Sequence, residues 1–210
     1  FKRSSRRRKT SGIRVAGGTS DNVQELLDFL HLEGAKRQFF PVVTELELTG
    51  ESGPLRSVGV NNFFIARDEN GQIAGTFAVW DQSQHKNIIV RGYKGRMAVA
   101  KKFTDLICKT DLLPDLEKSV KIKLASCIVI RDNRCDIFSA LLNAVINHLK
   151  QRSTGYLAIG FDSGDPLLQG VRMPWHLTLE SDIFQVYWPD LTDQPPTLDA
   201  RVKYYELGML

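Results

Sequence analysis

Residues 122–162, about forty positions, constrain this chain more than any other stretch, because the spacing of apolar residues changes twice within them. Residues 122–130 begin with in/out alternation and end in a continuous β-branched run, which is typical of a strand buried on both faces. Over 138–149 apolar side chains recur every three or four positions, as on one face of a helix. Residues 156–161 are apolar again and end in a polar turn. The stretch therefore predicts a strand, a turn, a helix and a second strand.

The polar turn 131–136 places two arginines, Arg131 and Arg134, beside the start of the predicted helix. The first amides of a helix have no partner within the helix and carry a positive partial charge, so this end can hold a phosphate. Asp136 lies in the same turn, where its carboxylate can instead cap the helix. Two interpretations stay open: a phosphate site, or a capped helix that packs on the sheet without a ligand.

The strand, turn and helix resemble the core of the GNAT N-acyltransferase superfamily. In that family the turn carries a Gln/Arg-x-x-Gly-x-Gly/Ala signature, and its amides cradle the pyrophosphate of acetyl-coenzyme A. This sequence keeps Arg131 but has Arg134 and Asp136 where the family prefers small residues. The resemblance implies an α/β (α+β) fold, with a mixed, mostly antiparallel central sheet, a β-α-β coenzyme-binding core and flanking helices.

The resemblance also implies where acetyl-CoA, or another acyl-CoA, would bind. The pantetheine is expected along 127–130, and the pyrophosphate is expected at amides from the turn and the first helical residues. The implied cofactor-binding residues are Cys127, Ile128, Val129, Ile130, Arg131, Asn133, Arg134, Cys135, Asp136, Ile137 and Phe138. The implied activity is direct transfer of an acyl group, expected to be acetyl, to an amine of a small molecule or peptide. The alternative is a GNAT-fold binding module that has lost catalysis.

Direct acyl transfer to an amine needs a base for the amine and stabilisation of the thioester oxyanion. GNAT enzymes usually use a carboxylate as base and a Tyr after the fifth strand as acid, but the corresponding stretch here has no Tyr. Three residues are candidates for this chemistry: Asp81 at the end of a hairpin strand, Asp162 beyond the second core strand, and Tyr187. Each also has a structural interpretation, because Asp81 can simply end a strand, Asp162 can cap a helix and Tyr187 can pack under the sheet.

The remaining apolar patterns follow the order of elements in GNAT domains. Before the core they predict a strand at 13–16, a helix over 23–30, a shorter helix within 39–48, and a hairpin of strands 62–67 and 73–80. After the core they predict a helix from Asp165-Pro166 to about Arg172, and strands at 181–188 and 202–207. The last two strands are expected to pair as the antiparallel end of the sheet.

Residues 82–121 form an insertion, because a plain connection between the third and fourth strands needs fewer residues. The insertion holds an apolar run at 88–93, a predicted helix around 97–108 and a turn at 112–114. A chain of 210 residues, 42% of them hydrophobic, is expected to form one GNAT-like domain over 11–210. The runs 78–82, 89–93 and 180–190 resemble a bacterial branch of GNAT-like proteins without an assigned substrate.

The charge of the chain is concentrated in residues 1–10, which carry six basic residues and no acid. The formal net charge is +4, so the remainder of the chain carries −2. We expect residues 1–10 to be a flexible solvated tail, with an arm that contacts anionic lipid or RNA as the alternative. A slightly acidic domain argues against specific nucleic-acid binding, and no apolar run approaches the roughly 18 residues of a membrane span.

The three cysteines, Cys108, Cys127 and Cys135, form no Cys-x-x-Cys pair and no disulfide framework, so a cytoplasmic location is the simplest expectation. Cys135 would be a reactive thiol if it were exposed at the helix N-terminus, and a buried, inert thiol is the alternative. The four histidines have no spacing typical of metal ligands, and no metal is expected. The oligomeric state is left open between monomer and homodimer.

Overall fold

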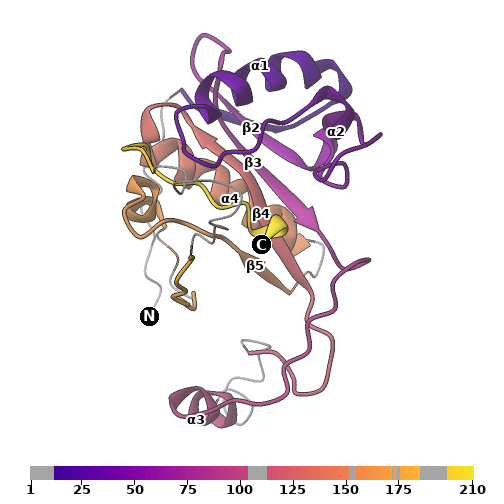
Figure 1. Cartoon of the computed structure of the whole chain (residues 1–210), viewed down its shortest axis with the longest axis vertical. Coiled ribbons are helices and arrows are strands. Elements are labelled where there is room, and N and C mark those ends of the chain that lie inside the picture. The colour runs from indigo at the N-terminus through magenta and orange to yellow at the C-terminus, as the bar shows by residue number, and fades with distance from the viewer. Residues whose placement is uncertain (1–11, 104–112, 152–154, 172, 174–175, 185–197) are drawn as a thin grey trace, which may run out of the picture.

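A five-stranded sheet forms the centre of the molecule, with its strands in the order β1-β2-β3-β4-β5 (Figure 1). The structure is a computed structural model that describes residues 12–103, 113–151, 155–171, 173, 176–184 and 198–210. The strands are β1 (Arg14–Gly17), β2 (Phe63–Arg67), β3 (Ile73–Asp81), β4 (Ile122–Ile130) and β5 (Tyr156–Ala158). Neighbours from β1 to β4 are antiparallel, whereas β4 and β5 are parallel. The sheet is therefore mixed and mostly antiparallel, as predicted.

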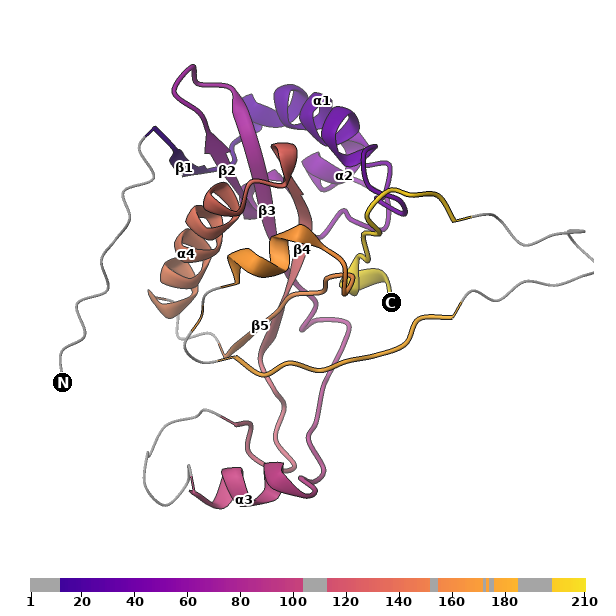
Figure 2. The same cartoon turned by 90° about the vertical axis from the view of Figure 1, so that its left-hand side faces the viewer.

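Helices cover both faces of this sheet, with α1 and α2 on one face and α4 on the other (Figure 2). The helices are α1 (Val23–Gly34), α2 (Glu45–Thr49), α3 (Arg96–Phe103) and α4 (Cys135–Gln151). Short 3-10 helices span Ser20–Asn22, Val60–Asn62, Arg131–Asn133, Pro166–Gly170 and Leu207–Met209. The connection from β4 through α4 to β5 is the β-α-β unit that the sequence predicted, and the order of elements confirms the GNAT-like fold.

Each face of the sheet carries its own hydrophobic core. On the α1 face, Leu26 and Leu30 pack against β2 and β4, and on the α4 face, Phe138 and Leu141 pack against β3 and β4. Burial of a side chain of this size contributes about 1.5–3 kcal/mol, so the two cores hold both helices firmly on the sheet. Gly75 permits the close approach of α4, because a Cβ at this position would lie 2.9 Å from the Ile137 side chain.

The prediction was accurate for the core crossover and for the β2–β3 hairpin. β4 has the predicted bounds, and the hairpin turns at the Asn-Gly pair. α4 begins at Cys135, three positions before its first predicted apolar residue, and α2 is a single short helix whose capping box joins Thr44 and Glu47. The predicted helix after β5 is a 3-10 helix, Pro166–Gly170, capped by Asp165 through the Leu167 amide; Arg172 lies outside the described residues.

The predicted end of the sheet is wrong in three places. β5 stops at Ala158 instead of continuing to 161, and residues 202–207 form no strand apart from one parallel bridge between Lys203 and Gln38. Residues 181–184 are also outside any strand, and 185–188 lie outside the described residues. The physical reason is that residues 202–208 occupy the outer edge of β4, where β5 would otherwise continue to pair. We call residues 202–208 the C-terminal segment.

The insertion 82–121 projects from one end of the sheet and carries α3 at its tip (Figures 1 and 2). Its two arms are joined by backbone hydrogen bonds, including Val120 N to Ile88 O at 2.8 Å, and by a bridge between Ile89 and Ser119. The predicted helix is found as α3, and residues 104–108 of that prediction lie outside the described residues.

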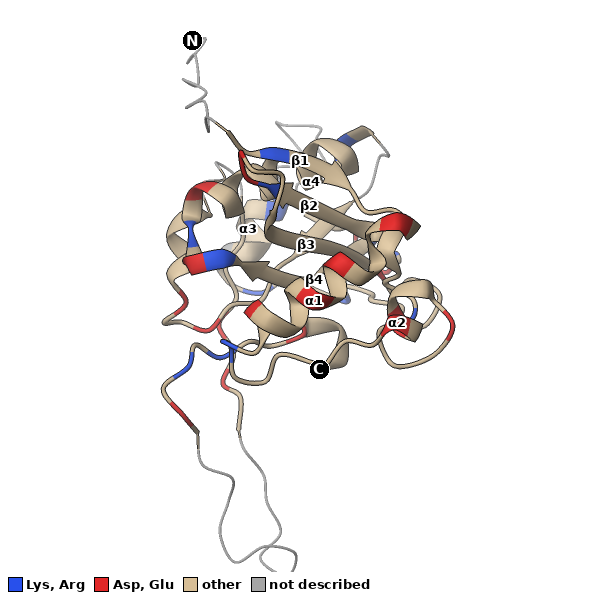
Figure 3. Cartoon of the chain, turned by 90° about the horizontal axis from the view of Figure 1, so that it is seen from above, with Lys and Arg blue, Asp and Glu red and all other residues tan. Residues whose placement is uncertain are grey.

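Acidic residues occupy the helices on the α1 face, as Figure 3 shows: α1 and α2 contain five Asp and Glu residues and no Lys or Arg. This distribution agrees with the acidic balance expected for the chain beyond residue 10. Among the helices in the described part of the chain, none is long and apolar enough to cross a membrane. The tail 1–10 lies outside the described residues.

Candidate functional site

The candidate site lies where β4 and β5 separate. The two strands pair at only three positions, Ile122 with Tyr156, Lys123 with Leu157 and Leu124 with Ala158. β4 continues for six more residues and stays paired with β3 on its inner edge. From Ala125 onward, β5 therefore leaves the outer edge of β4 to other partners. Main-chain donors on such an edge bind the oxygen atoms of an extended ligand or segment.

A β-bulge at Cys127 turns one of these donors outward. The pairing between β3 and β4 shifts by one residue at this point, and Cys127 adopts a left-handed conformation with φ of 47°. The Thr76 hydroxyl donates a 2.9 Å hydrogen bond to the Cys127 carbonyl, which holds the carbonyl toward β3. The Cys127 N–H consequently faces the outer edge. A left-handed backbone outside glycine is uncommon, and residues in strained conformations cluster at functional sites, where the surrounding structure sustains them.

The outward amides of β4 are bonded by side chains of the C-terminal segment. The Cys127 N–H donates to Glu206 Oε2 at 3.2 Å, and the Ile128 N–H donates to the Tyr204 hydroxyl at 3.3 Å. Glu206 Oε2 also accepts hydrogen bonds from the Ser126 and Tyr204 hydroxyls, each at 2.9 Å. Tyr204 and Glu206 are 6% and 5% exposed, so this cluster is sealed from solvent.

The electrostatics of the cluster follow from its burial. Burial raises the pKa of the Glu206 carboxyl, and hydrogen bonds from Cys127, Ser126 and Tyr204 offset part of that effect. Burial also raises the pKa of Tyr204 and of the Cys127 thiol, and the neighbouring Glu206 charge adds to both. A thiol held protonated in this way is a poor nucleophile. Glu206 Oε1 has no hydrogen-bond partner among the described residues.

The turn after β4 contains two left-handed residues, Asp132 with φ of 55° and Asn133 with φ of 50°. Arg131 precedes them, and its guanidinium points toward the β2–β3 hairpin. There it donates to the Ile73 carbonyl, lies 3.4 Å from Asp68 and stacks over the Phe29 ring at 6.0 Å. Arg131, the one signature residue that the sequence retains, thus serves the hairpin in this structure and not the tip of α4.

The N-terminal tip of α4 carries its own ion pair. Arg134 Nη2 lies 2.6 Å from Asp136 Oδ2, and both side chains are about half exposed. The hydrogen bond from Arg134 lowers the pKa of Asp136, and the amides of Ile137 and of Asp136 itself lower it further. The carboxylate of Asp136 therefore lies close to the first-turn amides, in the place where a phosphate would bind.

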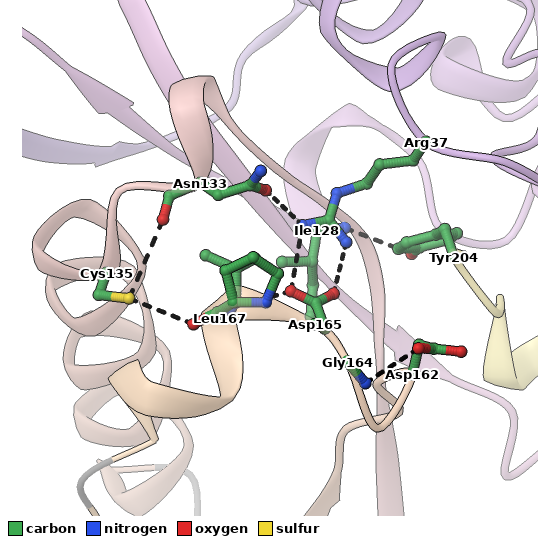
Figure 4. Close-up of polar contacts among 10 residues, drawn as sticks. Arg37, Ile128, Asn133, Cys135, Asp162, Gly164, Asp165, Leu167 and Tyr204 are labelled. Carbon is green, nitrogen blue, oxygen red and sulfur yellow. Dashed lines mark hydrogen bonds and ion pairs between the residues drawn. The ribbon is translucent and has the colours of Figure 1, made fainter. Parts of the chain in front are cut away.

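The other predicted cofactor residues have structural partners. Val129 and Ile130 pair with Thr76 and Gly75 of β3, and the side chains of Ile137 and Phe138 are buried in the core on the α4 face. The Cys135 thiol lies 3.4 Å from the Pro166 carbonyl, between α4 and the following 3-10 helix (Figure 4).

A buried ion pair that the sequence did not predict joins the end of α1 to the region after β5. Arg37 Nη1 lies 2.5 Å from Asp165 Oδ2, and Arg37 Nη2 donates to Asn133 Oδ1 at 2.7 Å (Figure 4). Asp165 also accepts from the Leu167 amide at 2.9 Å. Arg37 thus ties the β4–α4 turn to the 3-10 helix. The only sequence signal for it is a single arginine beside the apolar Phe39-Phe40 pair.

Asp81 and Asp162, the two predicted catalytic residues that the structure describes, lie at opposite ends of β5. Asp81 lies opposite Lys123, at the level where β5 begins, whereas Asp162 follows the carboxyl end of β5. Partial burial raises the pKa of Asp81, but hydrogen bonds from Lys123 and Ser83 outweigh it and lower the pKa to about 2. Asp162 accepts a hydrogen bond from the Gly164 amide at 3.0 Å (Figure 4). It also lies 4.0 Å from Lys203. Tyr187 lies outside the described residues.

Two cavities in the described part of the chain are small, at about 60 Å³ and 190 Å³. One cavity of about 190 Å³ is lined by the end of α1, the β4–α4 turn and Val202. Pockets that enclose small organic ligands usually measure about 300–1,000 Å³. With the outer amides of β4 bonded to Glu206 and Tyr204, and with Asp136 at the tip of α4, an acyl-CoA does not fit this arrangement as it stands. In the same part of the chain, no group of three His, Cys, Asp or Glu side chains is arranged to hold a metal ion.

Comparisons with known proteins return only structural similarities. The sequence matches no protein-family model and no curated protein. The structure is similar to an aminoglycoside acetyltransferase from an uncultured soil metagenomic sample, with 14% identity over 85% of this chain and 97% of that chain, and a TM-score of 0.48. It is also similar to a ribosomal-protein-alanine N-acetyltransferase from Brucella melitensis biovar Abortus 2308, with 12% identity over 84% and 99% and a TM-score of 0.49.

A GCN5-related N-acetyltransferase from Ralstonia eutropha JMP134 gives 12% identity over 82% of this chain and 97% of that chain, with a TM-score of 0.44. At these identities and scores the similarities carry no argument about activity or substrate. The case for function depends on the chain's own residues.

Proposed function

We propose that this chain is a GNAT-fold acyltransferase that moves an acyl group, expected to be acetyl, from acyl-CoA to an amine acceptor. The observation that carries the proposal is the separation of β4 from β5 immediately beside the Cys127 bulge. That separation presents two adjacent N–H donors, from Cys127 and Ile128, on a strand that leads directly to the N-terminus of α4. An extended amide-containing ligand and a pyrophosphate would find donors in this order.

Within this proposal, the residues of the chain have limited roles. The Cys127 and Ile128 amides bind oxygen atoms, and the first turn of α4 favours negative charge. Among the described carboxylates, Asp81 is a weak base because its pKa is about 2. The acceptor, the acyl length and the roles predicted for Asp162 and Tyr187 remain part of the proposal.

The first experiment is a binding measurement on the full chain. Acetyl-CoA should raise the melting temperature in proportion to the logarithm of its concentration, because a ligand that binds only the folded state stabilises it by mass action. ADP is the comparison ligand, because it shares the adenosine 5′-diphosphate of the cofactor but lacks the pantetheine. A folded sample that shows no shift at millimolar acetyl-CoA would count heavily against an acyltransferase. Release of free CoA thiol in the presence of an amine panel then tests turnover.

The second candidate function is a GNAT-fold binding module without catalysis. It is favoured by the Arg134–Asp136 pair, which places a carboxylate at the tip of α4. It is also favoured by the stretch after β5, which offers no Tyr at the expected position. A module of this kind would bind its partner with no release of CoA thiol for any amine, and acetyl-CoA would leave its melting temperature unchanged.

A further inference from the structure

The C-terminal segment occupies the gap between β4 and the chain that follows β5. Its Tyr204 and Glu206 side chains reach β4, while Leu207 packs against Gly160, two positions beyond the end of β5. A Cβ on Gly160 would lie 2.8 Å from Leu207 Cγ, so the Leu207 side chain packs directly on the Gly160 backbone. At the far end, the Gly208 carbonyl accepts a 2.8 Å hydrogen bond from Gln82 beyond β3. The segment is thus wedged along the proposed cleft.

The segment supplies the oxygen acceptors that the proposed ligand would also supply. A carboxylate oxygen meets the Cys127 N–H, and a phenol oxygen meets the Ile128 N–H. A pantetheine chain would offer carbonyl oxygens to the same two donors. One pair of amides cannot serve both, so the segment and an acyl-CoA compete for this edge.

The contacts of the segment with the sheet come from its side chains. Its main chain bonds to the main chain of Gln38, through Gln38 N to Val202 O at 3.0 Å and Tyr204 N to Gln38 O at 2.8 Å, and its Gly208 carbonyl accepts hydrogen bonds from the side chains of Gln82 and Lys86. Among the described residues, no hydrogen bond joins the main chain of the segment to the main chain of β4 or β5. Release therefore leaves the ladders of the sheet intact.

The central contact of the segment is also incompletely satisfied. Glu206 is 5% exposed, and no Lys, Arg or His among the described residues forms an ion pair with it. Its Oε1 atom accepts no hydrogen bond of ordinary geometry in the same part of the chain, and the nearby Gly208 amide contributes least among the donors that lower the pKa of the carboxyl. A buried acceptor without a partner, on a group that gains hydration when it is released, weakens the closed arrangement.

From these four observations we propose that residues 202–208 are an internal, displaceable occupant of the acyl-CoA cleft. The inference rests on the proposed function and adds its regulation: the cleft is closed in the free protein and opens when the segment leaves β4. Binding of acyl-CoA and release of the segment are then one coupled equilibrium. The apparent affinity for acyl-CoA is therefore the intrinsic affinity multiplied by the fraction of open molecules.

Hydrogen exchange on the full wild-type chain tests the displacement directly. At saturating acetyl-CoA, the peptide that contains Tyr204 to Gly208 should exchange at least about fivefold faster, because the Tyr204 amide loses the Gln38 carbonyl. Amides of Leu141 and Val145 in the buried part of α4 serve as the internal reference and should keep their rates. Acetyl-CoA binding with unchanged or slower exchange at 204–208 would overturn the displacement and leave the acyltransferase proposal standing.

A reversible disulfide provides the second test. In the variant Gly160→Cys/Leu207→Cys, the two new side chains start from positions close enough to cross-link, and oxidation should hold the segment in place. The oxidised variant should bind acetyl-CoA at least about tenfold more weakly than after reduction, while Leu207→Cys alone should respond to neither treatment. Equal affinity in both redox states would overturn the proposal.

A third variant separates the two proposals. Tyr204→Ala/Glu206→Ala removes both side chains that accept hydrogen bonds from the β4 amides. The variant should therefore bind acetyl-CoA more tightly than the wild type if the segment is an occupant. No binding by the wild type, by the reduced disulfide variant and by this double variant would overturn the occupant and the acyltransferase together.

Discussion

Asp165 and Glu206 are both buried carboxylates that join distant parts of the chain, yet they differ in what surrounds their charge. Asp165 faces the guanidinium of Arg37 at 2.5 Å, and both of its oxygens are bonded. Glu206 has hydroxyl and amide donors on one oxygen only, and the described residues offer it no cation. The difference separates a fixed structural contact from one that a change of protonation or a competing ligand can open.

Arg37→Ala should produce the largest effect, because it leaves the Asp165 charge buried without a partner. We expect a loss of about 3–5 kcal/mol in the free energy of unfolding, measured by urea denaturation at pH 7. Arg37→Met/Asp165→Leu removes both charges and should lose less than Arg37→Ala alone. A loss below about 1 kcal/mol for Arg37→Ala would mean that the pair is not the fixed contact described here.

Glu206→Gln tests the other half of the comparison through pH. Burial raises the pKa of Glu206, so its contribution to stability is complete below the ordinary pKa of about 4.3 and is lost as the pH rises through the raised value. Gln stays neutral and avoids that loss. The stability of Glu206→Gln relative to wild type should therefore increase across this window, by about 1.4 kcal/mol for each unit of the shift.

The nearest titratable neighbours of Glu206 do not confuse that measurement. Burial raises the pKa of both Tyr204 and Cys127, so both stay protonated throughout the window. The difference in unfolding free energy between the two proteins should be recorded at several pH values from 4 upward. A difference that is flat with pH would show that Glu206 does not titrate in the closed state.

The local part of this fold could be predicted from sequence because its signals are local. The β-branched run of β4, the apolar stripe of α4 and the Asn-Gly turn each specify an element within a few residues. The Cys127 bulge left no sequence signal, because a bulge depends on how two strands pair and not on one strand's composition.

The contacts that define the candidate site were beyond sequence reasoning because they join distant positions. Arg37 and Asp165 are 128 positions apart, and Ser126 and Glu206 are 80 apart. The sequence predicts a strand over 202–207, in which Tyr204 and Glu206, two positions apart, would share one face. No local pattern states that this face would meet the outer edge of β4 in place of β5.

Asp81→Asn extends the comparison to an exposed carboxylate. The pairing with Lys123 lowers the pKa of Asp81 to about 2, so its stabilisation is present above the ordinary pKa of about 3.9 and is lost as the pH falls toward 2. Because the pair is solvent-screened, we expect the substitution to cost at most about 1 kcal/mol at pH 7. In an acyl-transfer assay it should reduce the rate less than about threefold, whereas loss of a general base costs about 100-fold or more.

Asp136→Asn should change stability least, by about 0.5 kcal/mol, because solvent screens the interactions of this exposed carboxylate with Arg134 and with the first turn of α4. The same substitution should strengthen acetyl-CoA binding about threefold, because the negative charge no longer lies beside the first-turn amides. Asp132→Asn is the matched control, since it makes the same charge change at an exposed position outside that helix. Equal changes of affinity in both variants would indicate that only the net charge of the region acts on the ligand, and not the position of Asp136 at the helix tip. An unchanged affinity in Asp136→Asn would place the pyrophosphate elsewhere and favour the binding module, because the tip of α4 would then hold no anion even when its own carboxylate is neutral.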